Sequence, residues 1–142
     1  MPRKFRLQKV LDVRRIIARE KEKEFSLSMQ KLVTAEMRLV DLIFKRSAFT
    51  DLMKFGYGIR VRNIAEHHDY LASLTDAIKD QNNKINEIKK EVEKKRLVLL
   101  AATKERKVIE KLKEKAKIEF EKEMAVKEQA ILDEIAMRKY GL

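Results

Sequence analysis

Apolar residues recur every three or four positions along most of the second half of the chain. The run comprises Leu71, Leu74, Ile78, Gln81, Ile85, Ile88, Val92, Lys95, Leu99, Ala102, Arg106 and Ile109. Alternating steps of 3 and 4 give a mean repeat of about 3.5 residues, which keeps one side of an α-helix turned toward a neighbouring helix. The pattern therefore predicts a long coiled-coil helix from about residue 64 to about residue 139.

A second and less regular seam runs through the first half, where we expect a helix from about residue 3 to about residue 54. Its positions are Leu11, Arg14, Ala18, Lys21, Phe25, Ser28, Leu32, Ala35, Leu39, Leu42, Arg46, Phe49 and Met53. Several of these residues are polar or charged, so this helix is expected to be the looser partner. At 1.5 Å per residue, the two helices would span roughly 75 Å and roughly 110 Å.

The predicted reversal of the chain lies at about residues 55–63, between the two seams. It contains Gly56 and Gly58, the only closely spaced glycines, and glycine tolerates the positive φ of a tight turn. Asn63 followed by Glu66 resembles a capping box, so the second helix should begin near Ile64. At the chain ends, Pro2 suits a first helical turn and Gly141 suits a helix end.

The short connection predicts that the helices pack antiparallel, as a single all-α coiled-coil hairpin over residues 1–142. Centring the reversal on Gly56 and Tyr57 pairs residues whose numbers sum to about 113, such as Leu11 with Ala102, with a shift of one heptad left open. Residues beyond about 112 would then have no partner in the first helix. Their apolar positions nevertheless continue: Leu112, Ala116, Phe120, Met124, Ile131 and Ile135. Such a stripe indicates a partner outside the chain or a dimer.

The formal net charge of +11 is concentrated in two distant segments. Residues 1–23 carry nine Lys and Arg against three Asp and Glu, and residues 89–123 carry 13 against 8. Residues 24–88 and 124–142 balance. An antiparallel hairpin brings the two basic segments together, so the open end should be positive and the end with the turn neutral.

Composition excludes several classes of protein. Without cysteine the chain has no disulfide, thiolate nucleophile or cysteine metal site. It has no apolar stretch of about 18 residues and no visible secretory signal, so a cytosolic protein is expected. The only histidines, His67 and His68, point about 100° apart on a helix and cannot chelate one metal ion together. We expect His67 in the seam and His68 in solvent.

Neither catalysis nor nucleic-acid binding is favoured. The sequence has no glycine-rich phosphate loop, metal motif or catalytic triad, so we expect no enzyme activity, cofactor or small-molecule substrate. The charge run Lys89–Lys122 suits nucleic acid in sign. However, it alternates Lys with Glu at helical spacings, as in Glu91 and Lys95, which is typical of a solvated, ion-paired face. We therefore expect no nucleic-acid partner.

Apolar side chains near the turn outnumber those that one seam can bury. They are Val40, Ile43, Phe44 and Ala48 on the first helix, with Tyr70, Leu74 and Ala77 on the second. This surplus indicates either a thicker core near the turn or a docking surface for another protein.

Three segments resemble the FliJ family of the bacterial flagellar type III export apparatus. They are Phe5–Arg15 (FRLQKVLDVRR), Lys104–Lys115 (KERKVIEKLKEK) and the stretch from Glu128 that includes Asp133–Arg138 (DEIAMR). Chain length, the single Gly-x-Gly turn and the missing cysteine agree, so the resemblance covers essentially the whole chain. It implies a non-enzymatic, antiparallel two-stranded coiled coil similar to the γ stalk of F-type ATPases.

The resemblance also implies partners and a location. The open end would sit in the central pore of the hexameric export ATPase, the region toward the turn would bind the cytoplasmic domain of the export gate, and the protein would handle export chaperones. It would be cytoplasmic and peripherally associated with the inner membrane at the flagellar basal body. The alternatives are a general coiled-coil adaptor and a stalk subunit of another rotary ATPase.

Candidate site residues follow for both ends of the hairpin. For the ATPase we expect Arg14, Arg15, Arg19, Arg106, Lys107, Lys111 and Lys113 at the positive open end. For the gate, the resemblance carries over to Tyr70, Leu74, Ala77 and Gln81, and on the first helix to Glu36, Val40, Ile43 and Ser47. Because Ile43 and Ser47 replace expected aromatic residues, Phe44 is included as the substitute.

Overall fold

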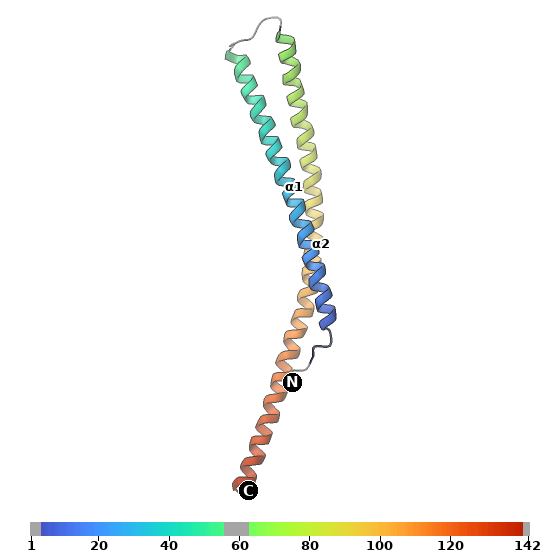
Figure 1. Ribbon diagram of the computed structural model, residues 1–142, viewed down its shortest axis with the longest axis vertical. Coiled ribbons are helices and arrows are strands. Elements are labelled where there is room, and N and C mark those ends of the chain that lie inside the picture. Colours follow the sequence, from blue (N-terminus) through green and yellow to red (C-terminus); the bar gives the residue numbers. More distant parts are fainter. Residues whose placement is uncertain (1–3, 56–62, 141–142) are drawn as a thin grey trace. The chain divides into compact units, whose positions relative to one another are not determined.

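Two long helices make up the described structure, which is a computed structural model covering residues 4–55 and 63–140 (Figure 1). Helix α1 comprises Gln8–Phe55 and helix α2 comprises Ile64–Tyr140. The two helices pack against each other in antiparallel directions, so the predicted all-α hairpin is confirmed. The predictions for Pro2, Gly56, Gly58 and Gly141 lie outside the described residues.

Helix α1 begins later than the sequence pattern predicts. Lys4–Leu7 precede the helix and lead into it through a turn. The backbone N–H of Gln8 donates to the carbonyl of Phe5 at 3.1 Å, and that of Leu11 donates to Leu7 at 2.9 Å. The residues that precede the helix therefore supply acceptors for two of the four N–H groups of its first turn. By contrast, α2 begins at Ile64, as predicted.

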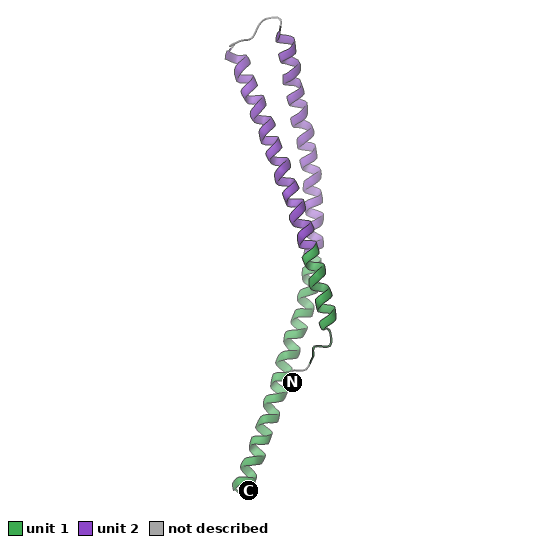
Figure 2. Cartoon of the chain, viewed as in Figure 1, with its two compact units in different colours: residues 1–20, 100–142 green, residues 21–99 purple. Residues whose placement is uncertain are grey.

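The chain divides into two compact units, which Figure 2 colours separately. Unit 1 comprises residues 1–20 and 100–142, and unit 2 comprises residues 21–99. Both helices therefore contribute to both units.

Unit 2 is held by a well-buried seam. Its buried apolar residues are Ala35, Leu74, Ile78, Ile85 and Val92, all at positions that the heptad pattern predicts. Two polar residues, Ser28 and Gln81, are buried among them. The Gln81 amide donates to the carbonyl of Ala35 on the other helix at 2.9 Å, and the Ser28 hydroxyl donates to the carbonyl of Phe25 at 2.7 Å. Their hydrogen bonds offset the cost of burying polar groups.

Unit 1 has a smaller apolar core and a long uncovered helix. Its buried residues are Leu11, Ala18 and Ala102, while the seam residues Arg14 and Arg106 are half-buried. Beyond the part of α2 that α1 covers, almost every side chain up to Tyr140 is exposed. Large apolar side chains are among them: Leu112, Ile118, Met124, Val126, Ile131, Leu132, Ile135, Met137 and Tyr140.

The helix register differs from the predicted one by about a heptad. Three contacts define it: Gln81 with Ala35, Phe49 with Tyr70, and Arg14 with Glu105. Their residue numbers sum to 116, 119 and 119, against the expected 113. The numbers of the helix ends, Phe55 and Ile64, also sum to 119. The pairing seen in the described residues therefore replaces the expected sum of 113.

Candidate binding surfaces

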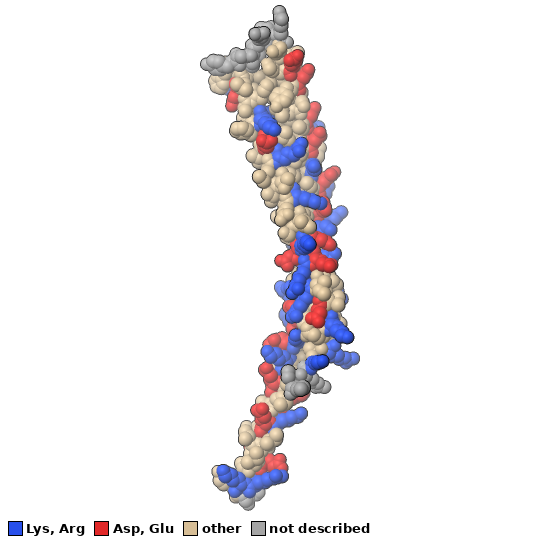
Figure 3. Space-filling model, in the orientation of Figure 1, with Lys and Arg blue, Asp and Glu red and all other residues tan. Residues whose placement is uncertain are grey.

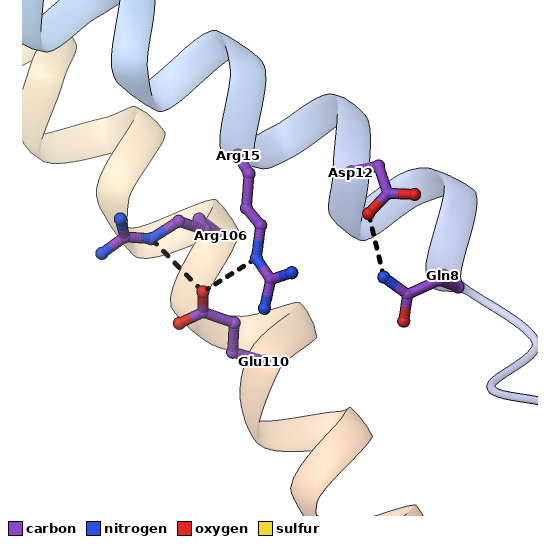
Figure 4. Close-up of polar contacts among 5 residues, drawn as sticks. All are labelled: Gln8, Asp12, Arg15, Arg106 and Glu110. Carbon is purple, nitrogen blue, oxygen red and sulfur yellow. Dashed lines mark hydrogen bonds and ion pairs between the residues drawn. The ribbon is translucent and has the colours of Figure 1, made fainter.

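Three of the four arginines predicted for the ATPase surface take part in ion pairs within unit 1. Arg14 pairs with Glu105 across the two helices, and Arg15 Nε lies 3.5 Å from Glu110 Oε1 (Figure 4). The same Glu110 oxygen lies 3.7 Å from Nε of Arg106. One carboxylate therefore serves an arginine from each helix, and these three arginines present less free positive charge than their sequence positions suggest.

Other predicted cations in unit 1 are free of such pairs. Arg19, Lys107 and Lys111 are exposed, and none forms an ion pair with any carboxylate in the described parts of the chain. Lys113 is half-buried and lines a groove in the same unit. Arg19, Lys107 and Lys111 are therefore the exposed predicted cations of unit 1 that stay unpaired within the described chain.

The groove lies between the residues that precede and begin α1 and one face of α2. Its lining is Lys4, Phe5, Arg6, Gln8, Lys9, Lys113, Ala116, Lys117, Glu119, Phe120 and Glu123, around a volume of about 970 Å³. The sequence pattern did not predict this groove because residues 4–7 were assigned to the helix. Phe5 and Phe120 lie outside the paired part of the two seams. Their large apolar side chains were the available sequence signal for the groove.

Near the turn, the predicted gate residues divide into exposed and buried sets. In unit 2, Val40 and Phe44 expose 66% and 71% of their surface, and Ile43 and Tyr70 are also exposed. On the face drawn in Figure 3, charged side chains are sparse over the part of unit 2 nearest Phe55 and Ile64. The exposed members therefore form a surface that a partner can reach.

Leu74 and Gln81 lie between the helices, each with only 7% of its surface exposed, and Ala77 is half-buried. Gln81 uses its amide to bond to Ala35. These side chains hold the hairpin together, so Val40, Ile43, Phe44 and Tyr70 are the predicted gate residues that remain exposed. Leu74 and Gln81 are seam positions of the heptad pattern, so their burial follows from that pattern.

The exposed apolar residues of α1 form a continuous stripe. Its members, spaced by three or four residues, are Met29, Val33, Met37, Val40, Phe44, Ala48, Leu52 and Phe55, all exposed. This spacing places them on one helical face. The stripe therefore continues from the apolar residues near the turn back to Met29.

The two histidines lie as expected. His67 is half-buried, and its ring centroid is 5.5 Å from that of Phe49, while His68 is exposed. Tyr70 packs edge-on against the same Phe49 ring, at 4.7 Å. In residues 4–55 and 63–140, no cluster of three potential metal ligands is present. Neither described helix is long and apolar enough to span a membrane.

Comparison with known proteins identifies the family. The family model described as "Flagellar FliJ protein" matches residues 3–142, which is essentially the whole chain. No curated protein and no solved structure matches the sequence. The chain therefore belongs to the FliJ family, whose members are non-catalytic components of the flagellar export apparatus.

Proposed function

We propose that this chain is a coupling stalk, a single hairpin over residues 1–142 that links the flagellar export ATPase to the export gate. Unit 1 contacts the hexameric ATPase, and the exposed apolar face of α1 in unit 2 contacts the cytoplasmic domain of the gate. The observation that carries the proposal is the chemical contrast between these surfaces: one is rich in unpaired cations and the other is apolar and sparsely charged.

The cationic surface suits an acidic partner because charge complementarity speeds encounter and favours the correct orientation. Arg19, Lys107 and Lys111 are the exposed predicted residues that remain unpaired within the described chain. Arg14 and Arg15 on α1 pair with Glu105 and Glu110 on α2, and Arg106 shares Glu110 from within α2, so these arginines keep less free charge for a partner.

The apolar surface suits a protein contact because a stripe of exposed large side chains is costly to leave in water. Val40, Ile43, Phe44 and Tyr70 supply the contact, while Leu74, Ala77 and Gln81 shape it from beneath. Family membership supports two further parts of the proposal: a role in handling export chaperones, and peripheral association with the inner membrane at the basal body.

Site-specific photo-crosslinking tests the assignment of the two surfaces. A photoreactive amino acid replaces Arg19 in unit 1 or Phe44 in unit 2, both exposed, and each variant is mixed with purified export ATPase and gate domain. We expect the ATPase to be captured from position 19 and the gate domain from position 44. Capture of the same partner from both positions, or exchanged capture, would contradict the proposal.

Substitution of the apolar face tests the gate contact independently. Val40→Asp with Phe44→Asp places two charges on the exposed stripe, so gate binding should fall at least about tenfold while ATPase binding is retained. The matched control is Arg38→Asp, which also places a carboxylate at an exposed position of α1. Circular dichroism checks that each variant remains helical. An unchanged gate affinity in the double variant would refute the apolar surface.

A further inference from the structure

Cations are numerous in the lining of the groove in unit 1. Five of its lining residues are cations: Lys4, Arg6, Lys9, Lys113 and Lys117. None of the five forms an ion pair with a carboxylate in the described parts of the chain. The nearby Arg14, Arg15 and Arg106 are all paired. The groove therefore presents five cations that no carboxylate of the described chain neutralises, while Arg19, Lys107 and Lys111 stay unpaired outside its lining.

The groove also has apolar walls. Phe5 and Phe120 line it, both half-buried, together with Ala116. Phe120 and Ala116 lie one helical turn apart on α2, so they form a continuous apolar strip. A ligand that matches this surface needs apolar side chains as well as negative charge.

The shape and charge pattern favour a peptide over a uniform polyanion. The α2 side extends from Lys113 to Glu123, about 15 Å at the helical rise. Glu119 and Glu123 line one part of the groove and repel closely spaced phosphates, whereas Lys113 and Lys117 attract carboxylates. An acidic segment with apolar anchors can place its charges beside the lysines and its apolar side chains on the two phenylalanines.

We infer that this groove binds an acidic peptide segment carrying apolar anchor residues, and that the segment belongs to the ATPase that contacts unit 1. The inference rests on the proposed function for the identity of the partner. The acidic and apolar character of the ligand rests on the groove alone.

The experiment compares two pairs of substitutions in the full chain. Lys113→Glu with Lys117→Glu reverses two groove cations, and Lys115→Glu with Lys122→Glu reverses two exposed cations outside its lining. Both pairs lie on α2 in unit 1 and change the net charge equally. They therefore separate a local groove from the general positive potential of unit 1.

Two probes are titrated against each variant at about 150 mM salt, where exposed charges are screened beyond about 8 Å. One probe is the purified export ATPase. The other is a fluorescein-labelled synthetic peptide of alternating Glu-Glu and Leu-Leu pairs, with a control peptide in which Ser replaces Leu. Circular dichroism confirms the helical content of every variant.

We expect the groove pair to lose about tenfold or more in affinity for both probes, and the control pair to lose less than about threefold. Phe120→Ala should lower the affinity of the chain for the Glu-Leu peptide. The serine peptide should bind the wild-type chain poorly. Equal losses from the two charge pairs, or an unchanged affinity in the groove pair, would overturn the inference.

Two further outcomes test separately the ligand class of the groove and the identity of the partner. If the wild-type chain binds the Glu-Leu peptide with the expected groove dependence but does not bind the ATPase, the acidic-peptide groove is supported and the proposed partner is refuted. If phosphatidylglycerol vesicles bind the wild-type chain with the same dependence on Lys113 and Lys117, the groove recognises an anionic surface and the inference is overturned.

Discussion

The two units use the same pair of helices in different ways. In unit 2 most of the seam is apolar: its charged members Lys21 and Lys95 are half-buried, Arg46 is exposed, and its buried polar residues Ser28 and Gln81 are both hydrogen-bonded. In unit 1 the seam includes Arg14 and Arg106, which are held by Glu105 and Glu110. A continuous heptad pattern therefore does not imply a uniform interface. What occupies each seam position decides whether the hairpin closes on itself or keeps charge near its surface.

The largest expected effect is on disulfide formation between two introduced cysteines, which tests the register in unit 1. The chain has no native cysteine, so Ala18→Cys with Ala102→Cys gives a single defined pair. Both alanines are buried, and their numbers sum to 120, close to the observed register. We expect rapid disulfide formation, measured by mobility on a non-reducing gel.

The control pair is Leu11→Cys with Ala102→Cys, which matches the register of 113. It is displaced by a heptad, about 10 Å along the helix, too far for a disulfide. Faster crosslinking of this pair would show that the sequence-derived register holds in unit 1.

The next largest effect compares truncation of the two seams. Ile85→Ala in unit 2 removes a buried side chain and leaves a cavity, so the free energy of unfolding should fall by about 2–4 kcal/mol. Ile109→Ala in unit 1 removes a half-buried side chain, so the loss should be smaller, about 1–2 kcal/mol. Urea denaturation followed by circular dichroism measures both. Equal losses would remove the energetic difference between the units.

Replacing a charged seam residue of unit 1 with an apolar one should make its seam more stable, as in unit 2. Arg106 Nε is buried without a hydrogen bond, and its nearest carboxylate oxygen, on Glu110, is 3.7 Å away. Arg106→Met keeps a long side chain and removes a charge without a hydrogen bond at Nε. Glu110 keeps its ion pair with Arg15. The free energy of unfolding should rise by about 1 kcal/mol. A marked fall in the thermal midpoint would indicate that the arginine contributes net stability.

The smallest effect concerns the ion pair between Arg14 and Glu105. Both side chains are substantially exposed, so solvent screens the attraction and side-chain entropy opposes it. A double-mutant cycle with Arg14→Ala and Glu105→Ala should give a coupling energy below about 1 kcal/mol. A larger value, persisting at high salt, would make unit 1 as tightly coupled as the apolar seam.

The sequence predicted the helices and their seams well because heptad spacing directly determines which side of a helix is buried. All twelve residues of the second seam are buried or half-buried, and α2 begins at Ile64. In the first seam, Arg46 is the exposed member. Its long charged side chain gains more from water than from a place between the helices.

The binding surfaces were harder to predict because they depend on register and on pairing across the helices. Spacing alone could not indicate that Glu110 serves both Arg15 and Arg106. The groove depends on residues 4–7 leaving the helix, a local turn for which no proline or glycine in that stretch gave a signal.

The uncovered part of α2 in unit 1 has a consequence for the strength of assembly. A helix without tertiary contacts has little cooperativity to resist fraying, so its order depends on what lies against it. Part of the energy gained when another surface covers this segment must therefore go into holding it helical. A partner that covers this segment would therefore bind more weakly than the buried area alone suggests.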